Sequence, residues 1–152
     1  MYLIVLGSLL VSTLAVPSPQ ELSIKQMIDS EKKCLANYPP ELKALLKEVK
    51  MKRAYPENPS NDFKCFMDCM GRELGIFDDQ GNYHFEKLKA FTGMVASDSS
   101  VTADEIHQAV EACIKVDHEL TCEKAHLYIT CKQDKLGHAK LSDEMEAALN
   151  NH

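Results

Sequence analysis

The chain has 152 residues, of which 45% are hydrophobic, and it carries a formal net charge of -6 at pH 7. This length fits a single domain that can bury a substantial hydrophobic core. The acidic charge disfavours nucleic acids and anionic lipid surfaces as partners, because both would repel a protein of the same sign.

Residues 1–15 are expected to form a secretory signal peptide. They are mostly apolar, and the small residues Thr13 and Ala15 suit the rule for signal cleavage. The absence of Lys and Arg near the start leaves a signal anchor as the alternative, but the apolar run is too short to span a bilayer. Residues 16–152 would then be the mature domain.

The first helix of this domain is predicted to start at residues 18–21. These residues combine an N-cap serine, a proline at the first helical position and a glutamate three residues after the serine. Apolar residues continue at helical spacing up to Cys34, and two prolines at residues 39–40 end the pattern.

Two further helices are predicted before the middle of the chain. The second opens at Pro40 and places its leucines and a valine on one stripe, and it is expected to fray at residues 52–55. A proline-rich loop at residues 55–61 ends at an N-cap and is followed by a third helix at residues 62–74, which stops at Gly75.

A turn at residues 78–82 separates these helices from the rest. Its acidic residues could suggest a calcium loop, but Lys89 stands where such a loop needs its closing glutamate. A fourth helix is predicted at residues 83–95. Thr102 and Glu105 form a second capping box that starts a fifth helix.

The last part of the chain predicts a sixth helix, with Thr121 as its cap, followed by a tail at residues 137–152. In the tail, Ser142 could cap a short seventh helix, or the tail could be mobile. Its titratable groups could gate a pocket with pH, or they could be solvated and have no effect. These groups are His138, Asp143, Glu144, Glu146 and His152. No useful strand-like alternation occurs, so the predicted fold class is all-α, a compact domain of six or seven helices.

The six cysteines are the strongest signal in the sequence. They are Cys34, Cys65, Cys69, Cys113, Cys122 and Cys131. Secretion favours full pairing, but six cysteines allow fifteen pairings and spacing alone does not choose among them. A Cys65–Cys69 bond would constrain little, because both residues leave one face of one helix. Zinc binding is the rival use, which the lack of a Cys-x2-Cys pair disfavours.

The cysteine spacing, C-x30-C-x3-C-x43-C-x8-C-x8-C, closely resembles that of the insect odorant-binding protein family, which includes the pheromone-binding and general odorant-binding proteins. The resemblance covers essentially the whole mature chain and includes the local segments 63–69, 78–82 and 122–125. It implies a disulfide-locked fold around an apolar cavity. It also implies the pairing Cys34–Cys69, Cys65–Cys122 and Cys113–Cys131.

The family resemblance implies a secreted carrier that binds small hydrophobic ligands, such as odorants or pheromones, and transports them through aqueous extracellular fluid. An odorant receptor would be an indirect partner, and a homodimer is open. No catalytic motif appears, so neither enzymatic activity nor a cofactor is expected. The alternative function is a secreted interaction or signalling protein with a filled core.

Twelve residues are candidates for contact with the ligand, although for each taken singly core packing, or for the two polar residues a surface or core position, is the more common role. The apolar candidates are Met70, Phe85, Leu88, Phe91, Met94, Val95, Ile106, Val110, Ile114 and Ile129. His126 and Tyr128 are candidates for a polar anchor.

Overall fold

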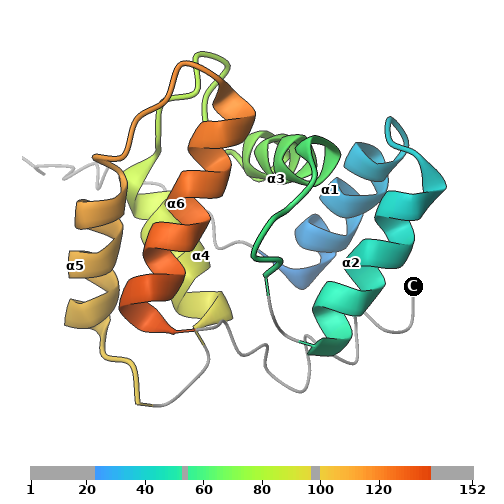
Figure 1. Ribbon diagram of the computed structural model, residues 1–152. Helices are drawn as coiled ribbons and strands as arrows, with labels where there is room; N and C mark the ends of the chain where they lie inside the picture. Colours follow the sequence, from blue (N-terminus) through green and yellow to red (C-terminus); the bar gives the residue numbers. More distant parts are fainter. Residues whose placement is uncertain (1–22, 53–54, 97–99, 138–152) are drawn as a thin grey trace, which may run out of the picture.

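The computed structural model describes residues 23–52, 55–96 and 100–137, which fold into six α-helices (Figure 1). The helices are α1 (Ile24–Leu35), α2 (Pro40–Lys52), α3 (Asn61–Glu73), α4 (Phe85–Val95), α5 (Ala103–Cys113) and α6 (Thr121–Leu136). Within these ranges the β-type pairing is a single isolated bridge between Phe77 and Tyr83. The prediction of an all-α fold is therefore confirmed. The expected signal peptide and the tail beyond residue 137 lie outside the described residues.

Several helix ends follow the local chemistry of the sequence. Ser60 accepts a hydrogen bond from the Phe63 backbone and caps α3, while Thr102 and Glu105 form the predicted capping box of α5. Gly75, which follows α3, has a φ of 66°, a value that favours glycine because it has no Cβ. In the turn before α4, the Asp78 carboxylate accepts backbone N–H groups that the turn leaves free.

Two predicted helix starts differ from the structure. The capping box of α1 is formed by Ser23 and Gln26, and Ser23 has extended backbone angles, so α1 begins later than the predicted start at residues 18–21, which lie outside the described residues. The prediction that Thr121 caps α6 is wrong. Leu120 occupies the N-cap, and its side chain has no acceptor for a cap bond. Thr121 is the first helical residue, and its hydroxyl donates to the Asp68 carboxylate of α3 over 3.3 Å.

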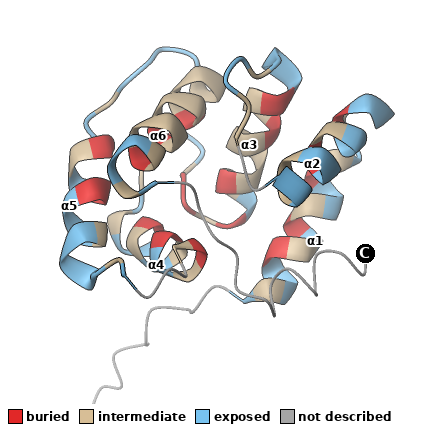
Figure 2. Cartoon of the chain, turned by 60° about the horizontal axis from the view of Figure 1, so that its bottom comes forward, coloured by how far each residue is buried: buried red, intermediate tan, exposed pale blue. Residues whose placement is uncertain are grey.

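Helix α3 connects the two halves of the fold. Figure 1 shows α1 and α2 on one side of α3 and α4, α5 and α6 on the other. α3 packs against both α1 and α6, and α5 packs against α4 and α6. The outer surfaces of α2 and α5 carry exposed stretches, whereas buried stretches occur on the inner faces of α3, α4 and α6 (Figure 2).

Three disulfides reinforce this arrangement, and their pairing is the one that the family resemblance implies. Cys34–Cys69 joins α1 to α3, Cys65–Cys122 joins α3 to α6, and Cys113–Cys131 joins α5 to α6. Because Cys65 and Cys69 lie on successive turns of α3, this one helix is bonded to both halves.

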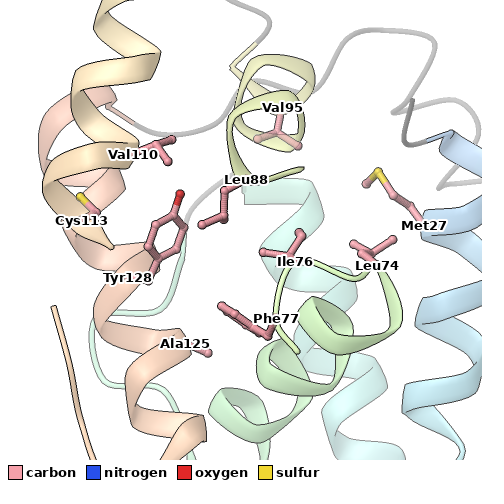
Figure 3. Packing of buried hydrophobic residues seen from close by; sticks show 10 residues of the cluster. All are labelled: Met27, Leu74, Ile76, Phe77, Leu88, Val95, Val110, Cys113, Ala125 and Tyr128. Carbon is pink, nitrogen blue, oxygen red and sulfur yellow. The ribbon is translucent and has the colours of Figure 1, made fainter. Parts of the chain in front are cut away.

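The apolar side chains form two clusters, one in each half. The larger cluster gathers residues from α1, α4, α5, α6 and the segment after α3 (Figure 3). The smaller one lies among α1, α2 and α3 and includes Leu42, Leu46, Phe63 and Phe66. Met70 of α3 packs against both clusters, so it marks the place where the two halves meet.

Candidate ligand-binding site

A cavity of about 270 Å³ lies where the two apolar clusters meet. Its volume exceeds the roughly 150 Å³ of an engineered apolar cavity that accommodates benzene, and it is near the lower end of the usual range for ligand pockets. Most of its lining is apolar. The lining residues are Met27, Glu31, Leu46, Val49, Lys50, Tyr55, Phe66, Met67, Met70, Gly71, Leu74, Ile76, Phe77, Leu88, Phe91, Val95, Ala125, Tyr128, Ile129, Lys132 and Gln133.

Half of the candidates taken from the sequence line this cavity. They are Met70, Leu88, Phe91, Val95, Tyr128 and Ile129. They come from α3, α4 and α6, whose buried stripes face the space between the two halves.

The other six candidates do not belong to the lining. They are Phe85, Met94, Ile106, Val110, Ile114 and His126. The five apolar ones pack within the larger cluster, where Val110 is fully buried and Phe85 places its ring edge-on to His107 of α5. The stripe of α5 is therefore used to attach this helix to α4 and α6, and it leaves no apolar face for the cavity.

The first half of the chain supplies lining residues that the sequence reading did not include. Met27 comes from α1, Leu46 and Val49 from α2, and Ile76 and Phe77 from the segment after α3. The apolar stripe of α2 was a visible signal, because a stripe on a short helix must be buried against something. Which side chains face a cavity and which face packed neighbours depends on how the halves are arranged.

Gly71 allows the Phe77 ring to lie directly on α3. A Cβ at this position would overlap the Cδ2 and Cε2 atoms of Phe77. Both residues line the cavity, so the missing side chain helps to set the shape of its wall.

Most polar groups in the lining have partners within the protein. Lys50 Nζ donates to Glu31 Oε1 over 2.6 Å and joins α2 to α1 at the cavity. The Tyr55 hydroxyl lies 3.0 Å from His126 Nδ1, and the two rings stack. Burial lowers the pKa of His126, so this contact is made by a neutral imidazole around pH 7.

The Tyr128 and Thr92 hydroxyls are buried, and neither has a hydrogen-bond partner among the described residues. Burial raises the pKa of Tyr128 to about 12, and the nearby Thr92 hydroxyl opposes this rise. In Figure 3 the Tyr128 hydroxyl points toward Val110 and away from Met27. The ring of Tyr128 therefore contributes the wall of the cavity, and its hydroxyl lies on the side of α5.

Lys132 is the unusual member of the lining. Only 9% of its surface is exposed, and burial lowers its pKa to about 8. Its ammonium lies 5.9 Å from the centroid of the Phe91 ring, which also lines the cavity. Sequence reasoning missed this residue because lysine is almost always exposed.

The described residues contain no group of three or more His, Cys, Asp or Glu side chains placed to hold a metal ion. Within the same ranges, no helix has the length and hydropathy needed to cross a membrane. All six cysteines are in disulfides, which leaves none of them as a free thiol.

The fold and its apolar cavity are those expected of a helical protein that encloses a small molecule. The model of the PBP/GOBP family matches residues 18–135, which is most of the chain. The chain therefore belongs to the PBP/GOBP family, the pheromone-binding and general odorant-binding proteins, which are carriers and not enzymes. No solved structure matches the chain.

Proposed function

We propose that this protein is a secreted carrier that holds one small hydrophobic ligand, such as an odorant or a pheromone, in the cavity between its two halves and transports it through extracellular fluid. Its mechanism is sequestration, with no covalent bond made or broken. Membership of a carrier family supports the general role. The observation that carries the proposal for this chain is the cavity of about 270 Å³ with its mainly apolar lining.

The expected affinity follows from the apolar lining. Burying about ten methylene groups contributes about 8 kcal/mol before the cost of association. A net free energy of about 8 kcal/mol corresponds to a dissociation constant of about 1 μM, so after the cost of association a micromolar constant is the tightest expected for a purely apolar ligand. Tighter binding would need a polar contact in addition.

Secretion is supported by the three disulfides, which form and persist outside the cytosol. The signal peptide at residues 1–15 remains a prediction from the sequence. Delivery to an odorant receptor and formation of a homodimer are further proposals that follow from the family alone.

Titration with a neutral apolar fluorophore, N-phenyl-1-naphthylamine, tests the proposal. We expect saturable binding with one site per chain and displacement of the fluorophore by alkanols of medium length. The chain has no tryptophan, so the fluorophore is observed without indole emission. A protein that is folded by circular dichroism and binds no apolar fluorophore would support the interaction protein with a filled core instead.

A further inference from the structure

Lys132 lies on the stripe of α6 that faces the cavity, with Gln133 beside it in the lining. Ala125, Tyr128, Ile129 and Lys132 all line the cavity, and they follow one another at the spacing of a single helix face. Lys132 thus occupies a position at which the helix otherwise presents buried apolar side chains.

Lys132 also lacks a counter-charge among the described residues. No carboxylate there forms an ion pair with it, since Glu31, the acidic residue of the lining, is paired with Lys50 over 2.6 Å. Its contact is with the π face of Phe91, which is weaker than an ion pair. The charged groups of the lining are therefore the paired Glu31 and Lys50 and the ammonium of Lys132, which has no ion-pair partner among the described residues.

A buried charge without a partner is costly unless something compensates it. The lowered pKa of Lys132, caused by burial, reflects this cost. At pH 7 the amine still carries a proton, because this pH lies below its pKa of about 8.

We propose that the cavity takes an amphiphile with a carboxylate end, of which a medium-chain fatty acid is the simplest case, with the carboxylate paired to the Lys132 ammonium and the alkyl chain along the apolar lining. This inference rests on the proposed carrier function and specifies the ligand class of the same site. The carboxylate would supply the charge that Lys132 lacks. The net charge of the whole chain does not oppose this, because distant surface charges are screened over about 10 Å.

The test compares two ligands of equal chain length, decanoate and 1-decanol, on the full mature chain at pH 7. The variant Lys132→Met removes the charge but keeps an unbranched apolar side chain. The control Lys135→Met makes the same change at an exposed position of the same helix.

We expect Lys132→Met to weaken decanoate binding at least about tenfold, because the ligand carboxylate would then be buried in an apolar site without a counter-charge. Decanol binding should change little, since decanol carries no charge. Lys135→Met should leave both affinities unchanged. Circular dichroism and the melting temperature establish that each variant is folded, and replacing an unpaired buried charge by an apolar side chain should not unfold the protein.

The outcomes separate the two proposals. If the wild type binds decanol but decanoate binding does not depend on Lys132, the carboxylate assignment is overturned and the carrier function stands. If the wild type binds neither ligand, the carrier function and the carboxylate assignment both fall.

Discussion

Gly71 and Gly93 offer a matched pair of substitutions that tests how the cavity wall is packed. Gly71 lies in the last turn of α3 and Gly93 in the last turn of α4, so the two occupy matched helical positions. Replacing a helical glycine by alanine stabilises a protein by about 1 kcal/mol where the new methyl group has room. The two sites differ in whether that room exists.

At Gly71 the added Cβ would overlap two ring carbons of Phe77 and approach a third, Cζ, to 3.2 Å. Phe77 is only 8% exposed, and its ring is not free to move away without disturbing its neighbours. At Gly93 the nearest atom is Cδ1 of Ile106 at 3.8 Å, an ordinary contact. Overpacking a core typically costs about 1–3 kcal/mol, which exceeds the gain in helix propensity.

We therefore expect the free energy of unfolding of Gly71→Ala to be at least about 1 kcal/mol lower than that of the wild type. The free energy of unfolding of Gly93→Ala should be about 1 kcal/mol higher than that of the wild type. For a domain of this size each kcal/mol corresponds to about 2–4 °C in melting temperature. Urea unfolding followed by circular dichroism, with the disulfides intact, measures both. Equal stability of the two variants would refute the packing of Phe77 on α3.

Two further predictions concern the buried lysine and the disulfides. Because the pKa of Lys132 is lowered from 10.5 to about 8, the unfolded chain binds more protons between these values, so the free energy of unfolding should rise by up to about 2 kcal/mol from pH 7.5 to 9.5. Lys132→Met should lose this rise in urea titrations, and an undiminished rise in the variant would show that Lys132 is not its source. Removing the Cys65–Cys122 disulfide by double alanine substitution should cost about 4 kcal/mol and weaken fluorophore binding, because it ties together α3 and α6, which both line the cavity. Removing Cys113–Cys131 should cost about 3 kcal/mol and affect binding less, since it attaches α5, which contributes no residue to the cavity lining. Equal losses of affinity would contradict the role of α3 as the link between the halves.

Local features were predictable because their causes are local. The capping box of Thr102 and Glu105 and the positive φ at Gly75 depend only on residues within one turn. The same reasoning failed at Thr121, which is the first helical residue of α6 and whose hydroxyl donates to Asp68 of α3. A local rule cannot anticipate a partner that is 53 residues away in the chain.

The cavity was only partly predictable for a related reason. Apolar stripes show which face of a helix is buried, but they do not show what the face is buried against. Val110 and Leu88 are both aliphatic residues on the apolar stripe of a predicted helix, and both are buried in the structure. Only Leu88 also lines the cavity. Lys132 could have been noticed as a charge on the stripe of Tyr128, although only the structure gives its burial.

The central claim is that ligand binds in the cavity between the two halves, and a pair of methionine substitutions tests it most directly. Met70 lines the cavity and packs against both clusters, whereas Met51 is 66% exposed on α2. Titration of N-phenyl-1-naphthylamine should show that Met70→Trp weakens binding at least about tenfold, because the indole fills the space that the ligand needs. Met51→Trp should bind as the wild type does. Undiminished binding by a folded Met70→Trp protein would contradict the claim.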